Sequence, residues 1–224
     1  MSAESRPSLP EPIICLITQR EYARVQSLPA LIKAAVDGGV NMIHIREKGL
    51  AQDDLLTLAH QVREVTQGKA LLFLNQQVEV ALACGADGIH LAEKGMSVES
   101  VRRQVGDELL IGRSVHSVES ARKMEAEGAN FLIVGTIFPT ASKPSGVPAG
   151  LDLLSRVATA VTIPYLAIGG INVGNVEQVM RRGSSGIAAI SAIFGAADPT
   201  KAANDIVEKA RWAYVASRNS EVAI

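Results

Sequence analysis

The residue best suited to proton transfer is His116. It directly follows the aliphatic run LLIGRSV (109–115) and precedes a polar segment that begins a predicted helix. An imidazole takes up and releases protons near neutral pH, so one side chain can serve as both base and acid. We therefore predict that His116 is a catalytic acid/base. His60, by contrast, is expected on the surface of a helix.

Two further histidines lie inside predicted strands. His44 belongs to MIHIRE (42–47) and His90 to GIHLA (88–92), and each alternates with aliphatic neighbours. Such a histidine can face a binding site, or it can be a hydrogen-bonded residue of the core. Both interpretations stay open, with His44 counted among the candidate substrate-binding residues.

Glycines and a short helix predict a phosphate site. Gly169 and Gly170 end the run PYLAIGG (164–170), where the backbone can approach an anion closely. The segment SAIFG after Ile190 is expected to form a short helix, whose first N–H groups, near Ile190 and Ser191, would point to the same place. The alternative is that the two glycines only turn a tight corner.

A loop rich in small residues, FPTASKPSGVPAG (138–150), is expected to close over an anion through Thr140, Ser142 and Lys143. Its alternative is a solvated connection with a stray charge. Other polar residues at or after strand ends complete the candidate substrate-binding set: Arg46, Lys48, Asn75 and Ser114. Glu93 also lies beside the strand that contains His90.

Eight aliphatic runs position these residues, and each is followed by a polar stretch with helical spacing. They are IICLIT (13–18), MIHIRE (42–47), ALLFLN (70–75), GIHLA (88–92), LLIGRSV (109–115), FLIVGTIF (131–138), PYLAIGG (164–170) and GIAAIS (186–191). A glycine precedes four of them as a helix stop. The pattern predicts an α/β fold, a single parallel (β/α)₈ TIM barrel, whose ligands bind at the C-terminal ends of the strands.

A doubly wound open sheet is the alternative fold, although its edge strands would be less aliphatic than any run seen here. No linker divides the 224 residues. We predict a flexible leader at 1–12, one catalytic barrel domain at 13–216 and a flexible tail at 217–224.

Charge and hydropathy exclude several partners. The net charge is −1, with 22 basic and 23 acidic side chains, so neither nucleic acid nor a membrane surface is expected as a partner. The longest apolar run, 186–197, is too short to cross a bilayer. The segment MSAESRPSLPEP lacks the apolar stretch of a secretory signal, which predicts a cytoplasmic location. Cys15 and Cys84 are expected to be reduced thiols.

The predicted strand ends lack a pair of carboxylates. Gln76, Gln77, Lys94 and Gly95 stand where metal-binding carboxylates would be placed. Because Mg²⁺ prefers carboxylate oxygens, metal-dependent chemistry is disfavoured and no metal or other cofactor is expected.

The motifs ICLIT, IHIREK, GADGIHL, IGRSVHS, GTIFPTASKP, IPYLAIGGI and SAIFGAADP resemble the thiamin phosphate synthase/TenI superfamily over about residues 13–200. One branch couples a pyrimidine pyrophosphate to a thiazole phosphate with magnesium. The other, the TenI branch, isomerises the thiazole phosphate carboxylate to its aromatic tautomer.

For the synthase branch, the resemblance implies a Gln-x-Arg-x-Lys motif, two metal-binding aspartates and a Thr-x-Thr-Lys loop. Arg46, Lys48, Asn75, Thr140, Ser142 and Lys143 match this pattern. His44 replaces the expected Gln, and Gln76 and Gly95 replace the two aspartates. Loss of both carboxylates is expected to abolish magnesium-assisted departure of pyrophosphate.

For the TenI branch, IHIRE and GRSVHS are similar, and that branch's acid/base histidine maps onto His116. The sequence is therefore interpreted as a metal-independent thiazole tautomerase, an isomerase of thiamin biosynthesis that acts on a small phosphorylated thiazole. Two alternatives stay open: a thiamin phosphate synthase, with magnesium as its cofactor, and a non-catalytic regulatory protein that binds a phosphorylated ligand. The oligomeric state is also open, with a homodimer as one option.

Overall fold

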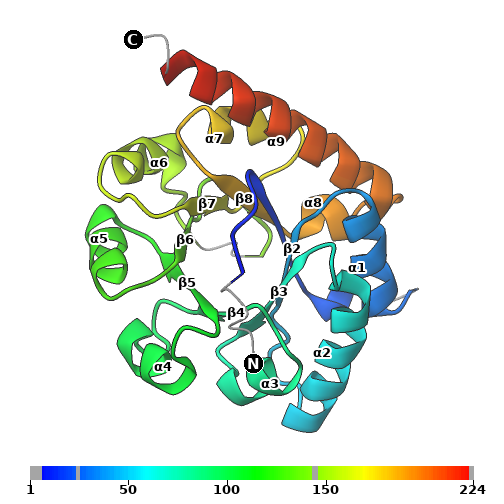
Figure 1. Cartoon of the computed structure of the whole chain (residues 1–224). Coiled ribbons are helices and arrows are strands. Elements are labelled where there is room, and N and C mark those ends of the chain that lie inside the picture. The colour runs from blue at the N-terminus through cyan, green and yellow to red at the C-terminus, as the bar shows by residue number, and fades with distance from the viewer. Residues whose placement is uncertain (1–6, 24–25, 143–145, 222–224) are drawn as a thin grey trace.

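The computed structural model describes residues 7–23, 26–142 and 146–221. Eight strands alternate with helices along the chain (Figure 1). The strands are β1 (Ile13–Ile17), β2 (Met42–Ile45), β3 (Leu71–Asn75), β4 (Gly88–Leu91), β5 (Leu110–Val115), β6 (Phe131–Gly135), β7 (Tyr165–Ile168) and β8 (Gly186–Ala189). Each lies within one of the eight aliphatic runs, so the predicted strands are confirmed.

The helices form a ring outside the strands (Figure 1). They are the 3₁₀ turn η1 (Arg20–Tyr22) and the α-helices α1 (Leu28–Asp37), α2 (Gln52–Thr66), α3 (Val78–Ala83), α4 (Val98–Val105), α5 (Val118–Ala126), α6 (Gly150–Ala158), α7 (Val176–Met180), α8 (Ser191–Phe194) and α9 (Pro199–Glu221). None of the helices in the described ranges is long and apolar enough to cross a membrane.

The sheet closes on itself in the order β1 to β8, with every neighbouring pair parallel. The barrel is closed by the pairing of β8 with β1, in which Ile14 is opposite Ile187 and Leu16 is opposite Ala189. A closed sheet has no edge strands, so the open-sheet alternative is wrong and the single (β/α)₈ barrel is confirmed.

Both faces of the strands are apolar, which explains their uninterrupted aliphatic sequences. In β1, Ile14 and Leu16 pack outward against the helices, whereas Ile13, Cys15 and Ile17 belong to a second cluster inside the barrel. That inner cluster also contains Phe73 and Phe131, whose rings meet edge to face with centroids 5.2 Å apart. These side chains fill the barrel interior below the strand ends that form the site.

Capping side chains fix where several helices begin. Ser27 accepts a hydrogen bond from the backbone N–H of Ala30 at the start of α1. Ser117 and Ser120 form a reciprocal capping box at the start of α5, directly after His116. This box satisfies backbone groups that would otherwise lack partners, and it fixes the turn by which the chain leaves β5.

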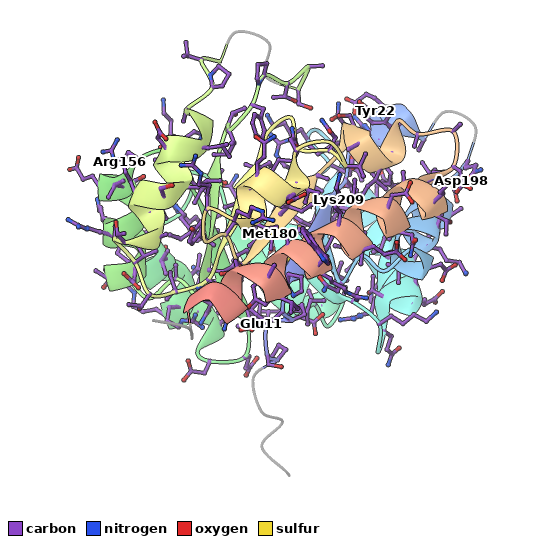
Figure 2. All side chains as sticks on the ribbon, turned by 90° about the horizontal axis from the view of Figure 1, so that it is seen from above. Glu11, Tyr22, Arg156, Met180, Asp198 and Lys209 are labelled. Atoms are coloured by element: carbon purple, nitrogen blue, oxygen red, sulfur yellow. The ribbon has the colours of Figure 1, made fainter. Side chains whose placement is uncertain are left out.

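The longest helix, α9, packs on α1, α7 and α8 (Figure 1). A side chain at Gly38, at the end of α1, would lie 2.5 Å from the carbonyl oxygen of Thr200, so glycine is needed for the close approach of the two helices. Figure 2 shows Glu11, which precedes β1, and Tyr22, which follows it, at opposite ends of the barrel. The end that carries Tyr22 is the C-terminal end of the strands.

Candidate active site

A cavity of about 280 Å³ opens at the C-terminal ends of the strands. Most of the predicted site residues line it, namely His44, Arg46, Asn75, Ser114, His116, Thr140, Ser142, Gly169, Gly170, Ile190 and Ser191. Lys48 is exposed and does not line it, and Lys143 lies outside the described residues. The barrel therefore gathers side chains from distant parts of the chain around one space, as parallel closure requires.

His44 and His90 lie deep in this cavity. Each is only 2% exposed, and their ring centroids are 4.7 Å apart. His90 Nε2 lies 2.8 Å from Ser114 Oγ, whereas His90 Nδ1 and both ring nitrogens of His44 make no hydrogen bond of acceptable geometry with a described residue. Buried polar atoms without partners are uncommon, and both residues that carry them line the cavity. Both histidines thus line the cavity, which the strand patterns had left open.

Burial keeps both imidazoles neutral. Loss of hydration lowers the pKa of His44 to about 3, and the positive charge of Arg46 adds to this shift, while nearby Asn75 opposes it. Burial also lowers the pKa of His90 well below its usual value, with further contributions from His44 and Arg113. Neutral imidazoles each carry one donor and one acceptor, so they can hydrogen-bond an uncharged heteroaromatic ring.

His116 is placed differently, at the rim of the cavity. Its side chain is 40% exposed, and its Nδ1 lies 3.2 Å from Oε2 of Glu93. A carboxylate at this distance selects the tautomer that carries a proton on Nδ1 and so leaves Nε2 for exchange with a ligand. Glu93 was predicted to lie beside the strand that contains His90, without a role in the site.

Arg113 supports the loop that carries Glu93. Its side chain is buried, one terminal nitrogen donates to the carbonyl oxygen of Glu93 at 2.8 Å, and the other donates to that of Met96. This function of Arg113 was not predicted from the sequence. The signal for it is an arginine inside an otherwise apolar strand, since a buried charge of this kind requires hydrogen-bond partners.

The glycine pair after β7 permits close backbone contacts. Gly169 and Gly170 have φ angles of 104° and 63°. A Cβ at Gly169 would lie 2.4 Å from Thr136 Cγ2, and one at Gly170 would lie 2.4 Å from the carbonyl oxygen of Pro139. The pair therefore makes the tight corner that we gave as its alternative role, and it also lines the cavity beside Ile190 and Ser191. Its role in binding phosphate stays a prediction.

The loop after β6 contributes Thr140 and Ser142 to the cavity wall. The backbone N–H of Ser142 donates to Thr140 Oγ1 over 3.4 Å, which is a long contact. Both residues carry a hydroxyl group that can donate to an anion in the cavity.

Gln76 and Gly95 are in direct contact. Gln76 follows β3 with a φ of 61°, and a Cβ built on Gly95 would lie 1.9 Å from Gln76 Oε1. No group of three or more histidine, cysteine, aspartate or glutamate side chains in the described part of the chain could hold a metal ion.

Comparisons with known proteins give a consistent result. Residues 14–193 match the family described as thiamine monophosphate synthase. The thiamine-phosphate synthase of Roseiflexus sp. (strain RS-1) is 40% identical over 192 residues, which cover 85% of this chain and 81% of that protein. That of Roseiflexus castenholzii is 38% identical over 200 residues, with 88% of each chain covered.

Comparison with solved structures gives the same family. The thiamine phosphate pyrophosphorylase from Pyrococcus furiosus has a TM-score of 0.82 and 33% identity, and the match covers 90% of this chain and 96% of that chain. A 3-hexulose-6-phosphate synthase, at 17% identity and a TM-score of 0.67, shares the fold alone.

These findings overturn the interpretation as a thiazole tautomerase. It depended on a few positions near the cavity, chiefly Gln76 and Gly95, whereas similarity to proteins named thiamine-phosphate synthase extends over most of the chain. A change at two metal-ligand positions does not by itself move a sequence to another branch. The resemblance to the superfamily is confirmed. The chain belongs to the thiamine monophosphate synthase family, which is a family of enzymes.

Proposed function

We propose that the protein is a thiamine-phosphate synthase, a transferase that joins a pyrimidine carried on diphosphate to a thiazole phosphate. The observation that carries this proposal is the 40% identity to a protein of that name over 85% of the chain. The matched region, residues 14–193, includes every residue that lines the cavity.

The reaction exchanges one bond for another. The C–O bond between the exocyclic methylene carbon of the pyrimidine and the diphosphate breaks, and its electron pair stays on the diphosphate. The lone pair of the thiazole nitrogen forms the new C–N bond. Because that nitrogen carries no proton, the attacking group needs no base, and the main task of the site is to orient both rings and stabilise the departing anion.

The cavity contains groups for both tasks. The neutral His44 and His90 line the cavity, and a neutral imidazole can hydrogen-bond a heteroaromatic ring. Arg46 and the hydroxyl groups of Thr140 and Ser142 line the cavity where they can hydrogen-bond the diphosphate. The thiazole phosphate is assigned to the backbone near Gly170 and Ser191.

His116 takes a different role from the one that the tautomerase interpretation gave it. Glu93 beside Nδ1 also stabilises the imidazolium form, in which both ring nitrogens carry a proton, and in that form Nε2 can donate its proton to the departing diphosphate. Proton transfer of this kind neutralises part of the negative charge that develops on the departing oxygen as the C–O bond breaks.

The test uses the purified full chain with both substrates, and the product is identified by chromatography and mass spectrometry. We expect thiamin phosphate and one equivalent of diphosphate, formed only when both substrates are present. A protein that binds either substrate yet forms no product, with or without added Mg²⁺, would instead be the non-catalytic binding protein considered as an alternative.

A further inference from the structure

Gln76 occupies the space that a side chain at position 95 would need. A Cβ on Gly95 would lie 1.9 Å from Gln76 Oε1 and 3.1 Å from the carbonyl oxygen of Ala92. The backbone N–H of Gln76 donates to the carbonyl oxygen of His90 at 3.0 Å, which fixes where the Gln76 side chain begins. A side chain at position 95 therefore requires the Gln76 amide to move to another rotamer.

Positions 76 and 95 are those at which the synthase pattern has metal-binding aspartates. Here one is a neutral amide and the other has no side chain. Glu93 is the only acidic side chain among the described residues that line the cavity, and its carboxylate is paired with His116 at 3.2 Å. Mg²⁺ binding ordinarily uses one or two carboxylates that are free to coordinate it. The residues present do not fit a magnesium site of the expected kind.

The loop that bears Gly95 is held by an arginine side chain in place of a metal ion. The buried guanidinium of Arg113 donates to the carbonyl oxygens of Glu93 and Met96, which flank this loop. A metal bound by residues 76 and 95 would join the same loop to the end of β3. Arg113 instead joins it to the end of β5, so the loop keeps its position without a metal.

A positively charged side chain lines the cavity on the side of β2. Arg46 lines the cavity and follows β2, and its backbone N–H donates to Thr18 Oγ1 at 3.0 Å. A guanidinium can bind diphosphate oxygens through two parallel hydrogen bonds and stays charged at every physiological pH.

We propose that this protein binds the diphosphate end of its substrate without a divalent metal. Arg46 supplies the compensating charge, and the Gln76–Gly95 contact fills the place of the metal ligands. The identity of the substrate rests on the proposed function, whereas the metal-free anion site rests on the contacts of Gln76, Gly95 and Arg113.

The first experiment measures binding of inorganic diphosphate to the full chain by calorimetry in the presence of a chelator. We expect saturable binding, which Arg46→Ala weakens at least tenfold, equal to about 1.4 kcal/mol. Lys209→Ala is the matched control, because Lys209 is an exposed cation on α9 and does not line the cavity (Figure 2). Diphosphate binding that is absent in chelator and restored by Mg²⁺ would overturn the proposal.

The second experiment measures Mn²⁺ binding by electron paramagnetic resonance, with diphosphate present. We expect none at this site in the natural chain and a new site in Gln76→Asp/Gly95→Asp, which supplies two carboxylates and removes the obstructing amide. Should this variant fail to fold, Gln76→Ala/Gly95→Asp frees the same space with a smaller change. A stoichiometric Mn²⁺ site in the natural chain that Glu93→Gln abolishes would contradict the inference.

The experiments distinguish failure of the proposed synthase function from failure of the proposed metal-free diphosphate site. Thiamin phosphate formed only with Mg²⁺ would overturn the metal-free site and leave the proposed function intact. Metal-free diphosphate binding without any formation of thiamin phosphate would overturn the proposed function and leave the metal-free site intact.

Discussion

His116 and Glu93 lie at the ends of neighbouring strands, with His116 Nδ1 3.2 Å from Glu93 Oε2. Strands β4 and β5 are paired directly, with Leu91 opposite Arg113. The contact therefore depends on the parallel pairing of β4 with β5, which brings the loop after β4 beside the end of β5. It gives the only acidic group on the described cavity wall a defined partner.

We expect His116→Ala to slow thiamin phosphate formation by about 100-fold or more, the usual scale for loss of a positioned acid or base, and to leave diphosphate binding largely unchanged. Single-turnover kinetics and calorimetry measure the two effects. The control is His60→Ala, because His60 is exposed on α2 and distant from the cavity wall. Equal turnover in the two variants would assign proton donation to another group.

Glu93→Gln should slow turnover less than His116→Ala does, because it removes the carboxylate that orients the imidazole and leaves the imidazole itself. Its effect should largely disappear in a background that already contains His116→Ala, since groups that act as a unit are not additive. A double-mutant cycle of turnover rates tests this. Full additivity would show that Glu93 acts independently of His116.

Gly170→Asp should abolish binding of the thiazole phosphate, because it adds bulk and negative charge to the predicted phosphate site. The residue has a φ of 63°, and its Cβ would meet the Pro139 carbonyl oxygen at 2.4 Å, so the fold will be strained as well. Gly170→Ala carries the same strain without the charge and serves as the control. Equal affinities in the two variants, measured by calorimetry under conditions where both are folded, would place the phosphate elsewhere.

The buried histidines should make stability depend on pH. In the folded chain, burial lowers the pKa of His44 to about 3, whereas in the unfolded chain it is about 6.5. The contribution of His44 to stability is therefore complete above about pH 6.5 and is lost as the pH falls toward 3, by up to about 1.4 kcal/mol per pH unit. Burial lowers the pKa of His90 as well, so its contribution changes with pH in the same direction.

Urea denaturation measured between about pH 7 and about pH 5 tests this, because few carboxylates titrate in that range. We expect His44→Gln to reduce the slope of unfolding free energy against pH and His60→Gln to leave it unchanged. A slope that stays the same in His44→Gln would mean that this imidazole is hydrated in the folded protein.

The fold could be predicted because each aliphatic run ends where polar residues begin, as the short strands of a closed barrel require. The orientation of His44 and His90 could not be predicted, because both faces of these strands are apolar, so a histidine between aliphatic residues could belong to either face. The contact of Glu93 with His116 joins two loops, and its geometry appears only when the strands are paired. The prediction of the TenI branch was wrong because it depended on Gln76 and Gly95, whereas similarity to thiamine-phosphate synthases extends over most of the chain.

The packing of α9 on α1 and α7 has a consequence for the order of assembly. The first strand needs the last as its neighbour, and the helix after β1 is covered by the helix that follows β8. During synthesis, one side of β1 therefore stays unpaired until β8 has left the ribosome. Contacts between such distant segments slow folding, so the early βα units are exposed to proteases and to aggregation for longer than the later ones.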